Sequence, residues 1–266
     1  MKNRKVFVLN PTQSKRLIAK GVISLPQVQQ ALHEGKIYIS RGSTNAYVLE
    51  EFYQTIGQPR EFNKGDFVAG QIVPNGPEKF MKWWVNKGNR LDEVLFVKGK
   101  PAKFEDRVKE IRKFTQGDLF IKGANALDLQ GIPAVLVGGK DGGTIGTLQG
   151  ILQAKGIEII CPIGLEKLVF HPVSETQFVM GMEKMDTPME GIPCGLIPMI
   201  SATVITEIEA MEALFECEVF HVASGGVGGA EGCISLLVDA YDDAEMKRII
   251  KFMEKIAREP IYQPNT

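Results

Sequence analysis

The chain has 266 residues, of which 44% are hydrophobic and 24% charged, and its formal net charge is −1. This composition is typical of a globular protein with a sizeable core, and it lacks the basic excess that would make nucleic acid a main partner. The apolar run near the N-terminus, Val6–Leu9, is too short for a signal peptide, and no apolar segment is long enough to cross a membrane. We therefore expect a cytoplasmic protein with no membrane partner.

The cysteines and histidines predict neither a metal site nor a disulfide framework. No two cysteines form a CxxC pair, and the three histidines make no metal-ligand pattern with them. We expect free thiols, no metal and no cofactor. Cys161 ends an apolar run without a basic neighbour close in sequence, which favours a structural thiol over a nucleophile.

The first strand-to-helix passage with a candidate binding loop lies near residue 40. Lys36–Ser40 reads as a strand, and Ala46–Thr55 has a helical pattern. The intervening Gly42-Ser43-Thr44-Asn45 places small residues and free N–H groups at a helix N-terminus, a geometry that binds anions. The alternative is that Ser43 or Thr44 only caps the helix.

A β-rich insertion is predicted near residues 66–98. Its expected strands are Phe67–Val73, Lys82–Val85 and Glu93–Val97, with turn residues between them. The pair Trp83-Trp84 is expected in the core or at an interface of this insertion.

The centre of the chain contains seven glycines between residues 122 and 146. Strands are expected at Leu119–Ile121, Pro133–Val137 and Ile157–Cys161, and a helix from Thr144 to about Lys155. Three passages from strand through loop to helix predict an α/β fold with a mostly parallel, Rossmann-like sheet and helices on both faces. A ligand site should then lie at the C-terminal ends of the strands.

The loop Gly138–Gly143 gives the strongest chemical signal. Its glycines allow close approach to a phosphate or carboxylate, with Lys140 as a charge partner, although it matches neither the Walker A nor the GxGxxG pattern. The alternative is a tight strand-to-helix connection. Asp128 is either a general base or a turn residue. The predicted ligand-binding residues are Gly42, Ser43, Thr44, Asn45, Gly123, Ala124, Asn125, Gly138, Gly139, Gly142, Gly143 and Thr144. The candidates for acid–base and charge-stabilising work are Asp128, Lys122 and Lys140.

The C-terminal part is predicted to be a separate unit. Residues 1–195 would form the α/β domain, and residues 196–258 a ferredoxin-like βαββα unit, starting with a strand at Leu196–Val204. Residues 259–266 form a tail. The loop Gly225–Gly232 is either a flexible hairpin or a lid that brings His221, Ser224 and Glu231 to a ligand.

Two blocks covering about 80 residues resemble a known superfamily. The passage GKIYISRGSTNAYVLEEF resembles the phosphate-binding passage of ribose-5-phosphate isomerases. The passages FIKGANALDLQG and GGTIGTLQGILQAKGIEIICPIG are similar to those isomerases, to methylthioribose-1-phosphate isomerase and to regulatory subunits of an initiation-factor exchange complex. The resemblance implies the ribose-phosphate isomerase, glucosamine-phosphate deaminase and CoA-transferase-like fold, with Ser43, Thr44 and glycines 138–143 binding an anion.

The chain departs from this pattern where the family carries its carboxylates. Asn125 stands where both isomerase types have aspartate, Lys122 stands where one type begins DGAD, and no glutamate lies within Gly142–Leu148. Because asparagine cannot act as a base, isomerisation by the family route is not expected. Two hypotheses follow. The chain binds a small phosphorylated metabolite, nucleotide or CoA-type ligand, as an isomerase- or transferase-like enzyme, or it is a non-enzymatic sensor or assembly protein of the same fold. A homo-oligomer is compatible with both.

Overall fold

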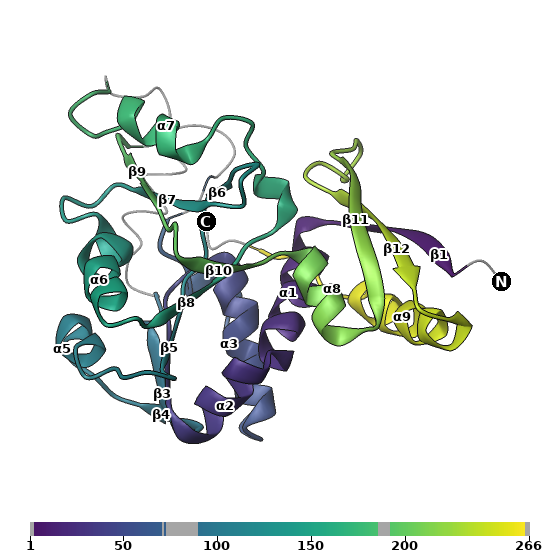
Figure 1. Ribbon diagram of the computed structural model, residues 1–266, viewed down its shortest axis with the longest axis horizontal. Helices are drawn as coiled ribbons and strands as arrows, with labels where there is room; N and C mark the ends of the chain where they lie inside the picture. The colour runs from purple at the N-terminus through teal and green to yellow at the C-terminus, as the bar shows by residue number, and fades with distance from the viewer. Residues whose placement is uncertain (1–2, 71, 73–89, 186–191, 264–266) are drawn as a thin grey trace.

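The computed structural model describes residues 3–70, 72, 90–185 and 192–263 (Figure 1). The strands are β1 (Arg4–Leu9), β2 (Lys36–Ile39), β3 (Val94–Val97), β4 (Lys100–Ala102), β5 (Leu119–Ile121), β6 (Ala126–Leu127), β7 (Pro133–Val137), β8 (Glu158–Pro162), β9 (Gly195–Pro198), β10 (Ala202–Ile205), β11 (Cys217–Ser224) and β12 (Ile234–Ala240). The α-helices are α1 (Pro11–Ser24), α2 (Pro26–Glu34), α3 (Ser43–Thr55), α5 (Arg107–Ile111), α6 (Gly143–Ala154), α7 (Val173–Val179), α8 (Glu207–Leu214) and α9 (Asp243–Ile256). Short 3₁₀ turns are η1 (Lys64–Asp66) and η3 (Leu165–Lys167).

The central sheet has six strands in the order β10-β8-β5-β2-β3-β4. The strands β10, β8, β5 and β2 run parallel, and β3 and β4 continue the sheet antiparallel. All three residues of β5 are buried, as expected of a strand that is covered on both faces. The prediction of an α/β fold with a mostly parallel sheet is confirmed.

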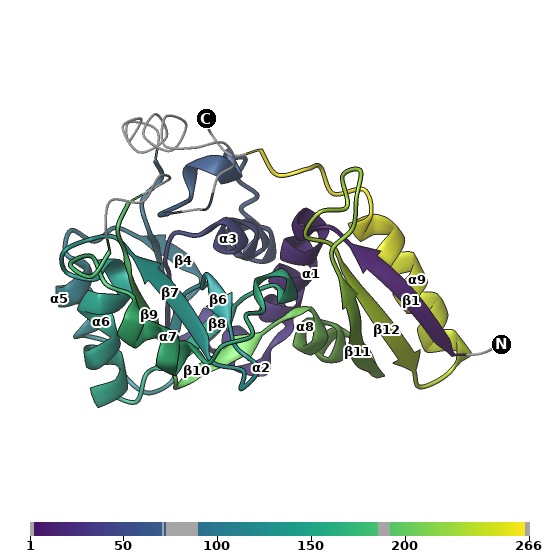
Figure 2. The same cartoon turned by 90° about the horizontal axis from the view of Figure 1, so that it is seen from above.

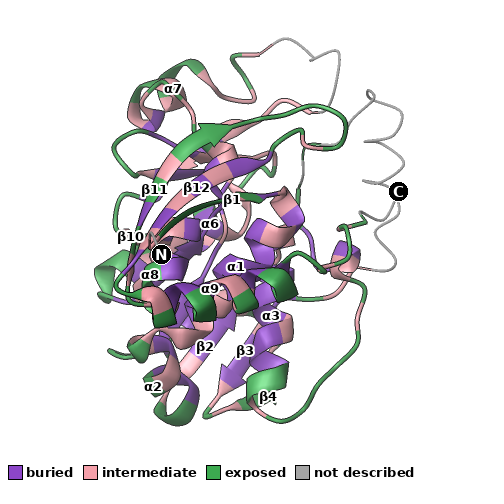
Figure 3. Ribbon diagram, turned by 90° about the vertical axis from the view of Figure 1, so that its right-hand side faces the viewer, coloured by how far each residue is buried: buried purple, intermediate pink, exposed green. Residues whose placement is uncertain are grey.

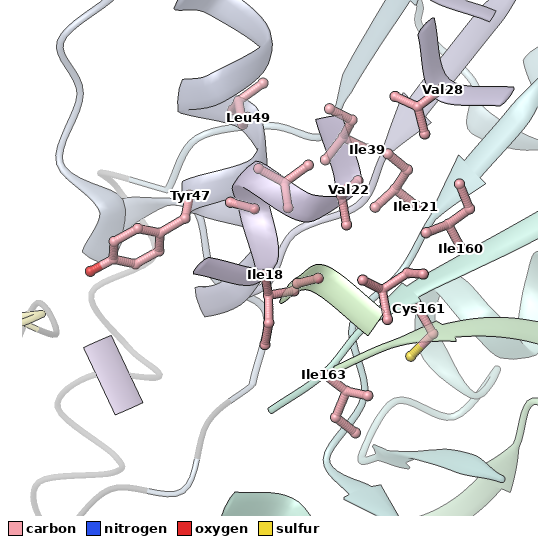
Figure 4. Packing of buried hydrophobic residues seen from close by; sticks show 14 of the residues in the cluster. Ile18, Val22, Val28, Ile39, Tyr47, Leu49, Ile121, Ile160, Cys161 and Ile163 are labelled. Atoms are coloured by element: carbon pink, nitrogen blue, oxygen red, sulfur yellow. The ribbon is translucent and has the colours of Figure 1, made fainter. Parts of the chain in front are cut away.

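Helices cover both faces of this sheet, with α1, α2 and α3 on one side and α5 and α6 on the other (Figure 1). On the first side, Ile39, Ile121 and Ile160 come from neighbouring strands and lie near Val22 of α1 and Leu49 of α3 (Figure 4). All five side chains are at most 2% exposed. Burial of each such side chain stabilises the fold by roughly 1.5–3 kcal/mol, so this layer holds the helices α1 and α3 against the parallel strands.

A second sheet, β6-β7-β9, is antiparallel. The predicted strand Pro133–Val137 is present as β7, but it pairs with β9 and lies outside the parallel sheet. The passage through the glycine-rich loop into α6 therefore starts from this smaller sheet. The expectation that all three strand-to-helix passages belong to one parallel sheet is wrong for this one.

The third sheet, β1-β12-β11, combines the two ends of the chain. The expected ferredoxin-like unit is not confirmed, because its first predicted strand is divided. Gly195–Pro198 pairs with β7, whereas Ala202–Ile205 joins the central sheet beside β8. The strand β1 supplies the third strand instead. The sheets thus cross the predicted boundary at residue 195.

The predicted β-rich insertion is only partly within the described residues. Glu93–Val97 is confirmed as a strand by β3. The described part of Phe67–Val73 follows η1 and is not a strand. Lys82–Val85, with Trp83-Trp84, lies outside the described residues.

One continuous core connects the central sheet to the third sheet. Helix α1 packs against α3 on one side and α8 on the other, and it also contacts β1, β8 and β10 (Figures 1 and 2). The tail after α9 returns along α1, where Tyr262 N donates to Thr12 Oγ1 at 2.9 Å.

Candidate functional site

The four parallel strands end at one edge of the central sheet. The segments that follow them are Ser40–Asn45 after β2, Lys122–Asn125 after β5, residues 163–167 after β8, and Thr206-Glu207 after β10. These segments contain buried polar side chains, namely Ser40, Thr44, Asn45, Lys122, Thr206 and Glu207. Because the C-terminal edge of a parallel sheet is where α/β proteins bind ligands, this edge is the candidate site.

The N-terminus of α3 carries two buried oxygens without partners. Thr44 is 3% exposed and Asn45 is fully buried. Among the described residues, neither Thr44 Oγ1 nor Asn45 Oδ1 has a hydrogen-bond partner. The amide of Asn45 is held in place, because Nδ2 donates to Ser40 O at 2.8 Å, and Oδ1 lies 3.7 Å from where a Cβ on Gly123 would stand.

The same helix end offers backbone donors. The first intrahelical bond runs from Ala46 N to Gly42 O, so the N–H groups of Ser43, Thr44 and Asn45 have no acceptor within the helix. Gly42 is the N-cap residue and contributes no side-chain cap. The predicted alternative, in which Ser43 or Thr44 serves as a side-chain cap, is therefore not what the structure has.

Lys122 is the buried cation of this edge. It is 9% exposed, and the one hydrogen bond of its Nζ to another described residue goes to Gly123 O at 2.8 Å. Burial lowers the pKa of Lys122 to about 8, although the nearby Cys161 and Glu93 oppose this shift. An amine of this kind can hold an anion when protonated and accept a proton when neutral.

Glu93 connects the sheet to the N-terminus of α6. Its carboxylate accepts a 2.5 Å hydrogen bond from Tyr38 Oη and a 2.8 Å bond from Thr144 Oγ1. Arg107 Nη1 lies 3.5 Å from the carboxylate and donates to Thr144 Oγ1 at 3.1 Å. The Thr144 hydroxyl, predicted to bind a ligand, is thus used by the scaffold, whereas its backbone N–H has no acceptor within α6.

The glycine-rich loop is shaped mainly by packing. Gly142 has a left-handed backbone (φ +68°) and is the N-cap of α6. A Cβ on Gly138 would lie 2.4 Å from Ile192 Cδ1, and one on Gly146 would lie 2.4 Å from Asp141 O. Lys140 is exposed. These contacts favour the alternative of a tight strand-to-helix connection for the loop, while the N–H groups at the start of α6 still point to anion binding.

Asn125 and Asp128 have scaffold roles. Asn125 Oδ1 accepts a 3.0 Å bond from Leu136 N, which ties the segment after β5 to β7. Asp128 is 1% exposed, and its carboxylate accepts three backbone bonds, from Gln130 N, Ile132 N and Val173 N, at 2.9 to 3.0 Å. The geometry favours the turn alternative for Asp128 over the general base. Gly123 and Ala124 do lie at the site, because their carbonyl oxygens accept bonds from Lys122 and Lys167.

A second group of charges at this edge was missed by the sequence reasoning. Lys15 of α1 and Glu166 after β8 lie 3.9 Å apart, Nζ to Oε1. Glu207 is fully buried, and its Oε2 accepts a 2.9 Å bond from Leu165 N. Within the described part of the chain, Glu166 Oε2 and Glu207 Oε1 have no hydrogen-bond partner.

Burial shifts the pKa values of Lys15 and Glu207 toward neutral pH. It lowers the pKa of Lys15 to about 8. Burial, followed by the nearby Glu166, raises the pKa of Glu207 to about 7. Glu166-Lys167 and Glu207 lie in the segments after β8 and β10, within a few residues of the strand ends, so their positions could have been inferred from the sheet. Lys15 lies in the interior of a helix, where no local pattern distinguishes it.

The remaining candidates behave as structural residues. Cys161 is fully buried, and burial raises the pKa of its thiol to about 12, as fits a structural thiol. His221 Nε2 lies 2.7 Å from Ser224 Oγ, and Glu231 accepts a 2.9 Å bond from Gly229 N, so these side chains bind within their own hairpin. No described group of three or more His, Cys, Asp or Glu residues is arranged to hold a metal ion.

Comparisons with known proteins do not place the chain in a family. None of the described helices combines the length and apolar character needed to cross a membrane. Searches against protein-family models and against curated proteins find no match. The candidate site therefore stands on its geometry alone.

Proposed function

We propose that the chain binds a small anionic metabolite, carrying a phosphoryl or carboxylate group, at the C-terminal edge of its parallel sheet. The observation that carries the proposal is the unpartnered Thr44 hydroxyl and Asn45 carbonyl oxygen, buried at the N-terminus of α3. Unpaired buried polar atoms destabilise a fold by about 1–3 kcal/mol each, and native proteins keep few of them. A bound ligand would satisfy them.

The charge of the site supports an anion. Lys122 lies at the end of β5, and Lys167 donates to Ala124 O at 3.1 Å in the same segment. Two helix N-termini, of α3 and α6, add free N–H groups and the positive ends of their dipoles. Asn45 Oδ1 is an acceptor, so it suits a hydroxyl or amine of the same ligand rather than its anionic group.

Acid–base chemistry is supported by Lys122, Lys15 and Glu207. Burial gives each of them a pKa between about 7 and 8, close to the range in which a side chain both takes and releases protons. An enzyme that transfers a proton on the bound metabolite is the first form of the proposal. Lys122 is the candidate for the side chain that transfers the proton. We do not assign this role to Asp128, whose carboxylate binds backbone N–H groups, or to Lys140, which is exposed.

A non-enzymatic sensor of the same ligand is the second form. It is favoured by Asn125 and Asp128, whose side-chain oxygens accept backbone hydrogen bonds that hold β6, β7 and α7 in place. Because these two side chains cannot act on a ligand, the site keeps groups that bind a ligand but has fewer groups that can accept a proton from it. Turnover of the bound ligand separates the two forms, because a sensor has none.

Substitution of Thr44 tests ligand binding without disturbing the fold. Thr44→Val has nearly the same shape and removes an unpartnered hydroxyl, so we expect the melting temperature of the ligand-free protein to stay equal or to rise. Sugar phosphates, nucleotides, acyl-CoAs and inorganic phosphate are screened by thermal shift. At 100-fold excess over Kd, a ligand should stabilise the wild-type chain by about 2.7 kcal/mol, and the variant less at the same ligand concentration.

The matched control is Thr55→Val at the other end of α3, where the hydroxyl donates to Glu51 O at 2.8 Å. It should bind the ligand as the wild type does. If none of the four ligand classes shifts the wild-type melting temperature, or if Thr44→Val and Thr55→Val reduce a shift equally, the proposed site is wrong. Lys122→Met then tests the charge, and it should abolish the shift produced by an anion.

A further inference from the structure

The sheet β1-β12-β11 has an apolar face on each side. Its inner face, with Leu9, Val219, Leu236 and Val238, lies in the core, and α1, α8 and α9 contact the strands (Figure 2). The side chains that alternate with these belong to the outer face. Four large apolar side chains of that face are exposed, namely Val6 (52%), Val8 (60%), Phe220 (49%) and Val222 (52%). A solvated face of an antiparallel sheet is normally polar, so this face has the composition of a covered one.

The strand register arranges the outer face in rows. Arg4, Asp239 and Glu218 form one row across the three strands, and Arg4 Nε donates to Asp239 Oδ2 at 2.7 Å. The next row holds Val6, Leu237 and Phe220. Val8 pairs with Ser235 in the third row, beside the irregular part of β11 near Val222. Much of β11 is coloured as exposed in Figure 3.

We propose that this outer face binds a second copy of the chain, with β1 of one protomer lying over β11 of its partner. The inference does not depend on the proposed ligand. A two-fold axis parallel to the strands brings Val6 over the partner's Phe220, and Leu237 over the partner's Leu237. Two sheets stacked in this way bury their apolar faces against each other at a spacing of about 10 Å.

The charges at the two edges of the face are complementary. The first row has a cation at the β1 edge and a carboxylate at the β11 edge. The two-fold operation therefore places Arg4 opposite the partner's Glu218, and does so twice in the dimer. It also places Asp239 opposite the partner's Asp239, where the hydrogen bond from Arg4 Nε at 2.7 Å offsets the charge of each carboxylate. Such self-complementarity is the requirement for an isologous interface, whereas a different protein would only need to match one side of the pattern.

The first test is the mass of the full chain in solution, measured by light scattering over a concentration series. We expect a mass near twice the 29.3 kDa of one chain. Phe220→Glu should reduce it to that of a single chain. The matched control is Phe178→Glu on α7, where the phenylalanine is 71% exposed and lies outside this face, and it should stay dimeric. A wild-type chain that is monomeric throughout, or a dimeric Phe220→Glu variant, would overturn the proposal.

The second test is an exchange of charges. Arg4→Glu places like charges across the predicted interface and should weaken dimerisation at least tenfold. Adding Glu218→Arg to the same chain restores opposite charges between protomers, and the dimer should recover. Lys251→Glu on α9, an exposed position outside the sheet, controls for the change in net charge. If the double variant does not recover while Lys251→Glu remains dimeric, the two-fold arrangement is wrong.

Discussion

At Glu207, burial opposes the charge of the carboxylate. Its side chain is fully buried, one carboxylate oxygen accepts a bond from Leu165 N, and the other has no partner within the described residues. The nearby Glu166 disfavours a second negative charge, while Lys15 favours one. Such a carboxyl group destabilises the fold when it ionises, and much less when it is protonated.

Replacing Glu207 should change how stability depends on pH. The pKa is raised from 4.5 to about 7 in the folded chain, so the unfolded chain loses this proton first as the pH rises. The group's contribution to stability is therefore fully present below pH 4.5 and is lost as the pH rises through about 7. Glu207→Gln removes the ionisation. Relative to the wild type, the variant should gain on the order of 3 kcal/mol between pH 4.5 and pH 8.

Urea unfolding at several pH values measures this difference directly. A control for the neighbouring carboxylate is Glu166→Gln, which should lower the pKa of Glu207 and so reduce the loss of stability without abolishing it. Parallel stability curves for the wild type and Glu207→Gln would contradict the prediction.

At the scale of single residues, the sequence predicted positions better than roles. Lys122 directly follows β5, and Thr44 and Asn45 lie in the first turn of the helix that follows β2. The end of a parallel strand is a place that a local sequence pattern can locate. The role of Asp128 depends on Val173 N, which lies 45 residues further along the chain. The residues next to Asp128 in the sequence do not predict such a long-range contact.

Helix α1 is the element to which the two ends of the chain are fastened. Arg16 is 7% exposed and binds carboxylates of three other residues. Nη1 donates to Glu51 at 2.6 Å, the Nε and Nη2 groups donate to Glu259 at 2.9 and 2.8 Å, and Nη2 also donates to Glu50. The guanidinium also lies 4.9 Å from the ring centre of Tyr47. One planar cation thus joins α1 to α3 and to the tail after α9.

Removing this cation should destabilise the chain strongly. Arg16→Met keeps much of the apolar stem but removes the cation shared by the three carboxylates, of which Glu50 and Glu51 keep Lys64 and Lys20 as partners. We expect a loss of about 3 kcal/mol in urea unfolding. The tail should also become more susceptible to proteolysis, because Glu259 loses its partner. Adding Glu259→Gln should recover part of the stability. An unchanged unfolding midpoint for Arg16→Met would show that the network contributes little.

At the scale of elements, the sequence located the apolar runs correctly, but the strand that it predicted at Leu196–Val204 is two strands that belong to different sheets. Leu196–Val204 reads as one strand, but Gly195–Pro198 and Ala202–Ile205 pair with different sheets. An apolar run records that its residues are buried and does not record which neighbour buries them. The ferredoxin-like unit is not confirmed for this reason.

The molecule as a whole depends on a close contact between α1 and α8. A Cβ on Gly21 would lie 2.5 Å from both Cα and Cβ of Ala210. Helix α8 in turn contacts β11 in the third sheet, and α1 contacts β8 and β10 in the central sheet. The distance between these two helices therefore sets how the two sheets sit relative to each other.

Two glycine-to-alanine substitutions test this contact. Alanine is favoured over glycine in a helix by about 1 kcal/mol, so Gly150→Ala in α6, where nothing lies within 4 Å of the new Cβ, should stabilise the chain. Gly21→Ala has the same propensity gain but forces α1 and α8 apart, and we expect a net loss of about 1–3 kcal/mol. Equal melting temperatures for the two variants would mean that the helices separate freely.

At this largest scale the sequence was least informative. The class of fold follows from alternating strands and helices, which are local features, and it was predicted correctly. The membership of β1 was not, because its pairing residues, Ile234 to Asp239, lie at the far end of the chain. A continuous apolar run can form an edge strand in any sheet. The tertiary contacts of the folded chain decide which sheet it joins.

The pairing of β1 with β12 has a consequence for how the chain is made. On the ribosome, residues 4–9 emerge long before their partners at 234–239. The central sheet has all its strands by residue 205 and can form earlier, whereas β1 has no strand to join until β12 has been made. During that interval the apolar residues of β1 have no sheet to cover them, so a chaperone could bind this segment. Closure of the third sheet therefore follows formation of the central sheet.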